Sequence, residues 1–286
     1  MNATLISVLM TAYNREAFIA EAIESVLSST YKNFELIIVD DCSKDKTVSI
    51  AKKYAHNDSR IKVYENEINL KDYPNRNKAA SYAKGDYIMY ADSDDILFPF
   101  AIEYCLGLML EDETADFGIY STDKFLSSKL LDSNFAINYH FFQNPFLVVG
   151  PGATIIKKIF FNKILYYPTK YGPANDMYFN LKAAVYGKVK VIDKAFFMYR
   201  RHDGQEQNNE YGYLYNRYNF LKDAVNELPF NLSDNQKEFI NKKNKRRFVV
   251  NCFKYFFSTC NFYKTIQLFK LTNFTFKDTI EGVFHK

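Results

Sequence analysis

Three carboxylates lie within four residues of the chain, in the stretch "YIMYADSDDI". Asp92, Asp94 and Asp95 follow a short apolar run that is typical of a buried β-strand. In an extended segment, side chains two residues apart point the same way, so Asp92 and Asp94 bring like charges together. Such charges repel, and burial increases the cost unless a cation compensates them. Because Mg²⁺ and Mn²⁺ bind carboxylates together with substrate phosphates, the pattern predicts a site for one of these ions.

A structural interpretation of the same residues stays open. Asp95 precedes "ILFPFAIEY", where a carboxylate at the start of a helix favours the helix dipole. The apolar run directly before the carboxylates favours the metal site.

Two further polar clusters follow apolar runs. "TAYNRE" begins at Thr11 and lacks the glycine pattern of a dinucleotide or P-loop site, which leaves a metal as the phosphate anchor. Tyr13 either stacks on a base or packs within the fold. In "VDDCS", we expect Asp40 to cap the following turn and Asp41 to bind a ligand, as acidic residues do in nucleotide-binding α/β folds.

The spacing of these clusters predicts the elements that position them. Apolar runs alternate with helical patterns, which predicts an α/β fold with a mostly parallel sheet and right-handed crossovers. If the strands are neighbours, the clusters meet at one edge of the sheet, beyond the carboxyl ends of the strands. We expect strands at 5–10, 34–39, 61–64, 87–91 and 117–121, and helices at 17–27, through 51–55 after an Asp45 N-cap, at 75–83 ending near Gly85, at 99–109 and at 175–185.

Composition separates the C-terminal part from the rest. The total charge is +4, but residues 240–286 hold ten Lys/Arg against two Asp/Glu, a net charge of +8 that leaves −4 for the preceding residues. Residues 206–286 read as helices rich in Phe, Tyr, Asn and Lys. They either pack their aromatic rings on the rest of the fold or lie on anionic lipid. RNA binding is a weaker alternative, because no RNA-binding module is visible and we expect no nucleic-acid partner.

The chain shows neither an export signal nor a membrane span. Its first residues have no basic segment before the apolar run, and no stretch approaches the roughly 20 apolar residues needed to cross a bilayer. The four scattered cysteines form no zinc motif and fit a reducing compartment. We expect a cytoplasmic protein, with peripheral contact to the inner face of the membrane through residues 240–286 as an option.

Several segments together resemble the family 2 glycosyltransferases. They are "ISVLMTAYNRE", "FELIIVDDCSKDKT", "NRNKAASYAKGDYIMYADSDD", and the later "ND" and "YRRHDG". The resemblance is strong over about residues 5–100, fainter to about 205 and absent beyond. It implies the GT-A fold, a nucleotide-sugar donor and an inverting mechanism. It also implies a catalytic domain at 1–205, with its nucleotide-binding half at 1–100 and its acceptor-binding half at 101–205, and a helical extension at 206–286.

The resemblance also implies roles for individual residues. The nucleobase would lie against Thr11–Tyr13, next to Asn14 and Arg15, and would be held by Asp41. Arg76 or Asn77 would lie near the pyrophosphate or base. In the D-x-D signature, Asp92 and Ser93 would face the ribose or donor sugar, and Asp94 would bind the metal, joined by Asp92 and His202. Phosphate would pair with Arg200 or Arg201.

The catalytic base implied by the resemblance is Asp176, in "ANDMYF". Asn175 stands where the family usually has Glu. The alternative is that Asp176 only compensates the dipole of the following helix.

These features predict a metal-dependent, inverting hexosyl- or hexosaminyltransferase. It would use a nucleoside-diphosphate sugar, UDP first, and a saccharide or lipid-linked saccharide acceptor in bacterial surface polysaccharide assembly. A nucleotidyltransferase is an alternative, although it would normally carry a Gly-rich basic loop after the first strand. A non-catalytic nucleotide- or carbohydrate-binding module is another alternative, against which the carboxylate set argues.

Overall fold

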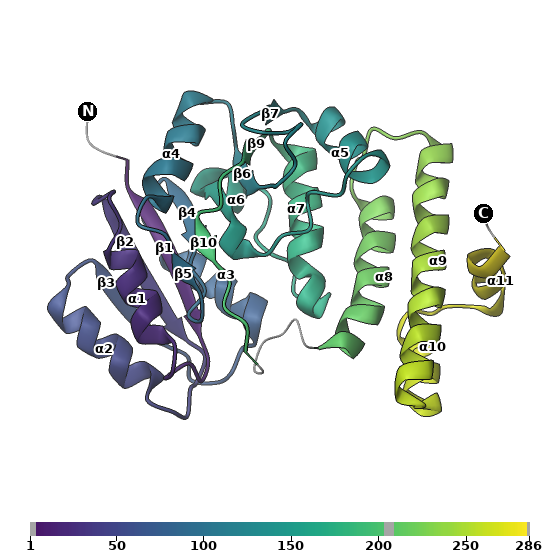
Figure 1. Cartoon of the computed structure of the whole chain (residues 1–286), viewed down its shortest axis with the longest axis horizontal. Helices are drawn as coiled ribbons and strands as arrows, with labels where there is room; N and C mark the ends of the chain where they lie inside the picture. Colours follow the sequence, from purple (N-terminus) through teal and green to yellow (C-terminus); the bar gives the residue numbers. More distant parts are fainter. Residues whose placement is uncertain (1–3, 203–208, 285–286) are drawn as a thin grey trace.

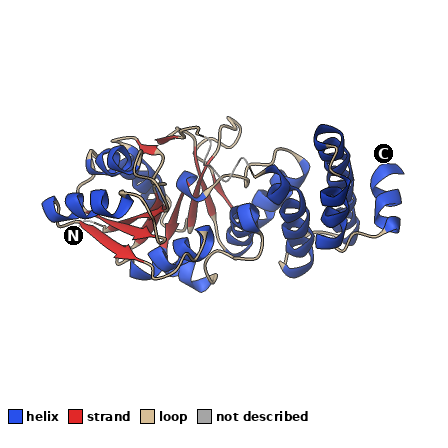
Figure 2. Cartoon of the chain, turned by 90° about the horizontal axis from the view of Figure 1, so that it is seen from below, coloured by secondary structure: helices blue, strands red, loops and turns tan. Residues whose placement is uncertain are grey.

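A computed structural model gives the fold and describes residues 4–202 and 209–284 (Figure 1). A sheet with helices on both faces forms the N-terminal part, and a row of helices extends from it toward the C-terminus (Figure 2). The expected architecture, a mostly parallel sheet flanked by helices with a helical C-terminal extension, is confirmed.

The main sheet has the strand order β3-β2-β1-β4-β8-β6-β9-β7. Its strands are β1 (Ile6–Ala12), β2 (Phe34–Asp40), β3 (Ile61–Glu65), β4 (Tyr87–Tyr90), β6 (Phe117–Tyr120), β7 (Leu130–Leu131), β8 (Thr154–Lys157) and β9 (Val189–Ile192). A second, antiparallel pair is formed by β5 (Ile96–Leu97) and β10 (Phe197–Met198).

The helices connect these strands and then continue alone. They are α1 (Ile19–Leu27), α2 (Thr47–Asn57), α3 (Asp72–Tyr82), α4 (Ala101–Glu111), α5 (Ser133–Phe142), α6 (Lys158–Lys163), α7 (Asn175–Tyr186), α8 (Glu210–Glu227), α9 (Asp234–Thr259), α10 (Phe262–Leu271) and α11 (Phe276–Phe284). Two single 3₁₀ turns, η1 (Pro151–Ala153) and η2 (Gly172–Ala174), precede β8 and α7.

The central position of β1 creates the place for a ligand. β1 pairs in parallel with β2 on one side and with β4 on the other, and its side chains are buried on both faces because helices cover both sides of the sheet. The chain moves outward from β1 to β3 and then returns to the far side of β1 as β4. Ligands bind beyond the carboxyl ends of strands at such a switch point. The polar segments that follow β1, β2 and β4 therefore meet at one edge, as the sequence predicted.

The other half of the sheet is partly antiparallel. β8 runs antiparallel to both β4 and β6, while β6 and β9 pair in parallel. The sequence predicted β6 but neither β7, α5 nor β8, because these elements are short or lie where aromatic residues hide the periodicity.

Two local expectations were wrong. Asp45 is not the N-cap of α2, which is Lys46; Asp45 instead accepts hydrogen bonds from the backbone N–H groups of Thr47 and Glu16, and so ties the β2–α2 loop to the loop after β1. Gly85 does not end α3, whose C-cap is Ala83. It is glycine because the backbone of β1 passes too close for a side chain.

The C-terminal helices pack on the sheet through α8. Phe220, Ala224 and Val225 of α8 join the same apolar cluster as α7 and β6, whereas α9 and α10 build a separate small cluster around Phe248 and Leu268. Core packing, one of the two interpretations of the tail, is therefore real for the inward faces of these helices. The domain boundary near residue 205 stays a prediction. Among the described residues, no helix has the length and apolarity needed to span a membrane.

Because the backbone before and within β1 lies close to Gly85, we expect alanine at Gly85 and alanine at Gly107 to change the free energy of unfolding in opposite directions. A Cβ at Gly85 would lie 2.6 Å from Ser7 N and 2.7 Å from Leu5 O, so Gly85→Ala should destabilise the protein by about 1–3 kcal/mol. Gly107, inside α4, has no atom within 4 Å of such a Cβ, so Gly107→Ala should stabilise by about 0.5–1 kcal/mol. Urea unfolding of both variants tests this, and equal effects would contradict the packing at Gly85.

Candidate active site

A cavity of about 720 Å³ opens at the carboxyl edge of β1, β2 and β4, a volume typical of small-ligand sites. One wall is formed by the nucleotide-half segments 11–15, 41, 69–76 and 92–94. The second wall comes from the η2–α7 region and α8, through Thr169, Gly172, Pro173, Asn175, Asp176 and Tyr213. Pro151 of η1 and Tyr199, which follows β10, complete the lining.

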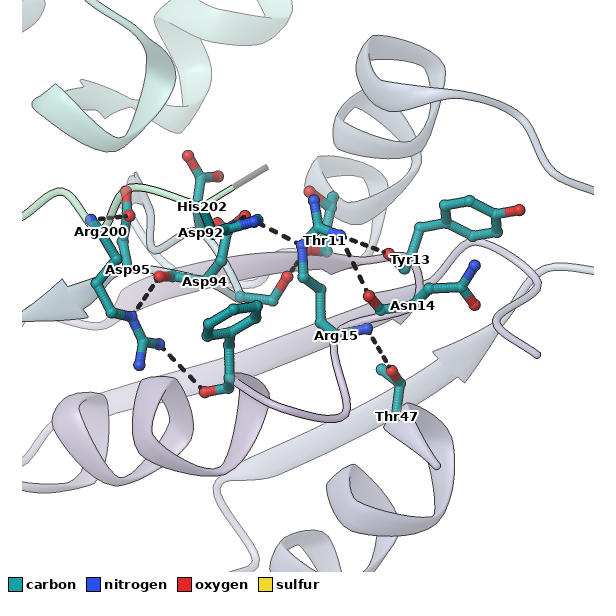
Figure 3. A network of polar contacts seen from close by, with 12 residues as sticks. Thr11, Tyr13, Asn14, Arg15, Thr47, Asp92, Asp94, Asp95, Arg200 and His202 are labelled. Carbon is teal, nitrogen blue, oxygen red and sulfur yellow. Dashed lines mark hydrogen bonds and ion pairs between the residues drawn. The ribbon is translucent and has the colours of Figure 1, made fainter. Parts of the chain in front are cut away.

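The loop after β1 is locked to the loop after β2. Asn14 adopts φ +52°, donates its backbone N–H to Ser43 Oγ at 2.8 Å, and accepts the Lys44 N–H on Oδ1 at 2.8 Å. The Arg15 N–H donates to Thr47 Oγ1 at 2.7 Å (Figure 3). These bonds turn the Arg15 side chain toward the carboxylates after β4. Tyr13 lies at the cavity with 45% of its surface exposed, so it is not a packing residue.

Asp94 lies between two nitrogen groups from distant parts of the chain. Its Oδ2 atom is 3.0 Å from Arg15 Nε and 3.0 Å from His202 Nε2 (Figure 3). The ring of His202 stacks on Phe18, with ring centroids 4.5 Å apart, which fixes the imidazole beside the carboxylate. The structure thus brings together Asp94 and His202, as expected for two ligands of one cation.

Asp92 is bound by Arg76 from α3. Arg76 Nη1 is 2.6 Å from Asp92 Oδ1, and Arg76 Nε is 2.7 Å from Asp72 Oδ1. Burial favours the neutral guanidine, but the charges of Asp72 and Asp92 hold the Arg76 pKa well above its usual value. Burial raises the pKa of Asp92, against the opposing effect of Arg76. In this conformation Asp92 is therefore compensated by arginine.

Asp95 positions the segment that carries His202. Its Oδ1 accepts the backbone N–H of Arg200 at 3.0 Å, and Arg200 Nε donates to the Asp94 carbonyl at 2.5 Å. Burial, followed by the charge of Asp92, raises the pKa of Asp95 to about 7. The interpretation of Asp95 as a helix start is wrong, because β5 follows it and α4 begins only at Ala101.

Arg200 also holds the segment that carries His202, through contacts with α1 and the residue before it. It pairs with Glu21 and donates to the carbonyl of Phe18 at 3.2 Å.

Ser93 Oγ donates to the Thr11 carbonyl at 2.8 Å and joins the ends of β4 and β1. Arg201 is exposed.

The two aspartates after β2 have different roles. Asp40 accepts the Ser43 N–H at 2.8 Å and the Ser43 hydroxyl at 2.5 Å, so it caps the turn as expected. Asp41 lines the cavity and accepts three hydrogen bonds, from Asn66 Nδ2 and from the N–H groups of Leu70 and Lys71. Asp41 therefore holds the loop before α3, and a role in base binding stays a prediction.

Asn77 does not belong to the cavity. Its amide donates to the Tyr167 carbonyl at 2.9 Å and accepts the Tyr167 N–H at 3.1 Å, and it is not among the residues that line the cavity wall. Asn77 is structural in this conformation, whereas Arg76 lines the cavity. Of the two residues expected near the pyrophosphate or nucleobase, Arg76 is therefore the one that remains a candidate for ligand binding.

Asp176 is a buried carboxylate at the start of α7. It lies on the cavity wall, and burial raises its pKa to about 7, although the Met177 N–H donates to Oδ1 at 2.7 Å. The neighbouring Asn175 is buried and fixes this corner, because its amide accepts the Tyr171 N–H and donates to the Gly172 carbonyl. Asn175 thus shapes the turn before the base candidate.

Glycines hold the backbone close to both acidic groups. A Cβ at Gly152 would lie 3.6 Å from Asp92 Oδ2, and a Cβ at Gly150 would lie 3.8 Å from Asp176 Oδ2. The segment from Gly150 to Gly152 therefore lies beside the two carboxylates and links the D-x-D corner to the base candidate.

Sequence reasoning missed several cavity residues. Lys71 (φ +70°), Asp72, Thr169, Tyr199 and Tyr213 all line the wall. Of these residues, only Asp72 could have been predicted from the sequence. It precedes Arg76 by four residues on a helix, and this spacing is typical of an ion pair.

The donor set around Asp94 suits a hard divalent cation. Asp94 Oδ2 and His202 Nε2 are 3.0 Å apart, which is a hydrogen-bond distance. A carboxylate oxygen and an imidazole nitrogen are both groups that bind divalent cations. No cluster of three or more His, Cys, Asp or Glu ligands occurs among the described residues. This corner therefore offers two protein ligands and leaves the remaining positions to water or substrate phosphate, which fits Mg²⁺ or Mn²⁺.

Comparison with protein families decides the class of this chain. The family model described as glycosyl transferase family 2 matches residues 7–203, which is most of the chain. The protein belongs to glycosyltransferase family 2. The nucleotidyltransferase and binding-module alternatives are thereby set aside, and the chain is a glycosyltransferase.

Curated relatives carry glycosyltransferase names. GlyG of Streptococcus pneumoniae serotype 4 is 28% identical over 233 residues, 72% of this chain and 74% of GlyG. WfgD of Escherichia coli, named a UDP-Glc:alpha-D-GlcNAc-diphosphoundecaprenol beta-1,3-glucosyltransferase, is 40% identical over 111 residues, 39% of this chain and 43% of WfgD. For the relatives with the strongest matches, the aligned region spans only 36–44% of their length.

Solved structures share the fold at low sequence identity. Staphylococcus aureus TarS in complex with UDP-GlcNAc has a TM-score of 0.73 and 22% identity, covering 97% of this glycosyltransferase and 81% of that chain. A mannosyltransferase of Pyrobaculum calidifontis, solved with GDP-Man and Mn²⁺, has a TM-score of 0.65 and 13% identity, covering 97% and 85%. These likenesses confirm the GT-A fold.

The buried carboxylate of Asp176 predicts a stability effect that depends on pH. Its pKa of about 7 in the folded state exceeds its ordinary value of 3.8, so the folded protein binds the proton more tightly. Stability is therefore lost as pH rises from about 4 to 7, by up to about 4 kcal/mol. Asp176→Asn removes this loss. The substitution should raise the melting temperature at pH 8, and this increase should become smaller toward pH 4. An increase in melting temperature that is the same at all pH values would contradict the raised pKa of Asp176 in the folded protein.

Proposed function

We propose that this glycosyltransferase transfers a hexose or N-acetylhexosamine from a nucleoside-diphosphate sugar, UDP first, to a saccharide hydroxyl with inversion at the anomeric carbon. The observation that carries the proposal is the position of Asp176. A buried carboxylate with a pKa near 7 lies in the same cavity as the Asp92–Asp94 corner. A base poised near the working pH is suited to accept a hydroxyl proton.

The donor would occupy the β1–β4 wall of the cavity. In this proposal the nucleobase of the donor lies against the segment from Thr11 to Tyr13, near Asp41. Tyr13 offers an exposed ring on which the nucleobase can stack. Asp92 faces the ribose or donor sugar, and Arg76 adds positive charge beside it. The choice of UDP is supported by the UDP-sugar in the TarS complex and in the name of WfgD.

The metal would be held by Asp94 and His202, with Asp92 within reach after Arg76 releases it. When bound, such a cation neutralises charge on the leaving diphosphate. Asp95 and Arg200 keep His202 in place, because they fix the backbone on either side of the contact. Arg15, which shares Asp94 Oδ2 with His202, is then available to a phosphate oxygen.

The reaction then follows from the two walls of the cavity. Asp176 accepts the proton of the acceptor hydroxyl as that oxygen bonds to the anomeric carbon. The bond from this carbon to the diphosphate oxygen breaks on the opposite face, and the nucleoside diphosphate leaves with the electron pair. Attack and departure on opposite faces invert the configuration. The acceptor must therefore approach from the η2, α7 and α8 side.

The acceptor proposed here is a saccharide or lipid-linked saccharide of bacterial surface polysaccharide. The name of WfgD specifies a diphosphoundecaprenol-linked acceptor, and a relative in Bacillus subtilis is named for teichuronic acid biosynthesis. A lipid-linked acceptor would lie at a membrane surface, and we place this enzyme at the cytoplasmic face of the membrane.

A membrane contact would be made by an aromatic corner at the junction of α9 and α10, defined as Phe253, Phe257, Phe262, Tyr263 and Ile266. Phe257, Phe262 and Tyr263 are 75%, 67% and 72% exposed. Lys254 and Lys264 lie within the same turns. Rings and lysines in this arrangement suit the interface of an anionic bilayer. The corner lies on the lower side of Figure 1, as does the carboxyl end of β1.

The base assignment predicts a large and selective loss of turnover. Asp176→Asn should lower kcat by about 10²–10⁴-fold, because the amide cannot accept the proton. Donor binding, measured by calorimetry with UDP and Mn²⁺, should stay unchanged. For the unaltered enzyme, kcat/KM should rise with pH and level off above about pH 7, because the pKa of Asp176 in the free enzyme is about 7. Turnover of the variant within tenfold of the unaltered enzyme would identify another base.

The aromatic corner predicts binding to anionic vesicles. Phe257→Ser combined with Phe262→Ser should reduce flotation with phosphatidylglycerol vesicles, because two exposed rings are lost from the interface. Ile159→Ser on α6 is the matched control, since Ile159 is 78% exposed but lies on the sheet domain. Equal flotation of all three proteins would contradict the membrane contact.

A further inference from the structure

A second hollow, of about 200 Å³, lies between α8 and α9. Its walls carry basic and amide side chains above an aromatic floor. The lining residues are Glu210, Tyr213, Leu214, Arg217, Tyr218, Asn244, Arg247, Phe248, Asn251 and Lys254. We call this hollow the α8–α9 groove.

The cations that line the groove have no acidic partners in the described part of the chain. Arg217, Arg247 and Lys254 form no ion pair with any carboxylate among the described residues, although Glu210 lies at the rim. Arg217, Arg247 and Lys254 are exposed as whole residues, but partial burial of the Arg247 guanidinium, together with the nearby charge of Arg217, lowers the pKa of Arg247. Such crowding of like charges costs free energy in the folded protein, and a bound anion relieves it.

Amide groups hold this arrangement in place. Arg247 Nη2 donates to Asn244 Oδ1 at 3.1 Å, and the buried Asn244 in turn donates to the Tyr218 carbonyl at 2.9 Å. The guanidinium of Arg217 lies over the Tyr213 ring, with its carbon 5.6 Å from the ring centroid. Both guanidinium groups are thus oriented by groups of the fold, and their remaining N–H donors are suited to bidentate phosphate oxygens.

The groove lies between the base candidate and the aromatic corner. Tyr213 lines both the active-site cavity and the groove. η2, which leads into α7 and Asp176, packs directly on α8: a Cβ at Gly172 would lie 2.8 Å from Asn216 Nδ2. At the other end, Lys254 is one residue from Phe253 and three from Phe257, on the adjoining face of α9. The cavity of Asp176 and the groove are thus neighbours that share Tyr213.

We propose that the α8–α9 groove binds the diphosphate that joins the acceptor saccharide to its lipid, through Arg217, Arg247 and Lys254. The proposal rests on the proposed function, because it takes the acceptor to enter past Tyr213. The saccharide then lies between Asp176 and Tyr213, the diphosphate in the groove, and the lipid chain over the aromatic corner. The same phosphate chemistry is offered by membrane phospholipids, so the test separates these two sources.

The experiment measures binding of inorganic pyrophosphate to the full chain while UDP and Mn²⁺ saturate the donor site. Isothermal titration is applied to the unaltered protein, to Arg217→Gln and to Arg247→Gln. Arg247→Lys tests rescue by a conserved charge, and Lys237→Gln, on the first turns of α9 outside the groove, is the matched control. Melting temperatures verify that each variant is folded. Flotation with phosphatidylglycerol vesicles forms the lipid arm.

The expected result is saturable pyrophosphate binding that weakens about tenfold or more in each Gln variant, weakens less in Arg247→Lys, and does not change in Lys237→Gln. Flotation should be unchanged by Arg217→Gln. Pyrophosphate affinity equal in all folded variants would overturn the proposal, as would a loss of flotation without a loss of pyrophosphate binding, which would assign the cations to phospholipid. If UDP itself fails to bind, the proposed function fails; if UDP binds and pyrophosphate does not, only the groove assignment fails.

Discussion

The contact of one carboxylate with two nitrogen groups organises this enzyme. Asp94 Oδ2 lies 3.0 Å from both Arg15 and His202, which come from the loop after β1 and from the segment after β10. The carboxylates at the end of β4 would repel one another if they were not compensated. Arg15 and Arg76 supply that compensation in the described conformation, and His202 adds a hydrogen bond to Asp94. In the proposed mechanism, a divalent cation held by Asp94 and His202 would take over part of this compensation, and donor binding would then be coupled to a rearrangement of these side chains.

The rest of the fold keeps that contact in place. β1 and β4 are adjacent, and Ser93 joins their ends, so the two halves of the contact cannot separate. Asp95 and Arg200 fix the returning segment from the other side. Asp176 comes from a different wall, built on the antiparallel half of the sheet and on η2. In the proposed mechanism, donor binding and proton transfer would therefore depend on separate structural units that meet at one cavity.

The nucleotide half was predictable because its signals are local. The apolar runs of β1, β2 and β4 stand directly before "TAYNRE", "DDCS" and "DSDD", and parallel pairing brings their ends to one edge. The sequence therefore predicted that these segments meet at one edge, while the roles of Asp94, His202 and Asp176, which the family resemblance implied, stay predictions. The acceptor half was not predictable, because its wall is assembled from distant short pieces such as Thr169, Gly172 and Tyr213. The docking role of Asp95 and the structural role of Asn77 depend on contacts more than 85 residues away in the chain. No periodicity records such contacts.

The central claim is that Asp94 makes donor binding depend on a divalent cation. The most direct test is calorimetric titration of UDP into the unaltered enzyme and Asp94→Asn, each with Mn²⁺ and again with EDTA. Asp234→Asn, on the first turn of α9, serves as the charge-matched control. We predict that Mn²⁺ tightens UDP binding at least about tenfold in the unaltered enzyme and in the control, and that Asp94→Asn loses this gain while it keeps the weak binding in EDTA. Equal UDP affinity with and without Mn²⁺ in the unaltered enzyme, or a full Mn²⁺ effect in Asp94→Asn, would contradict the account.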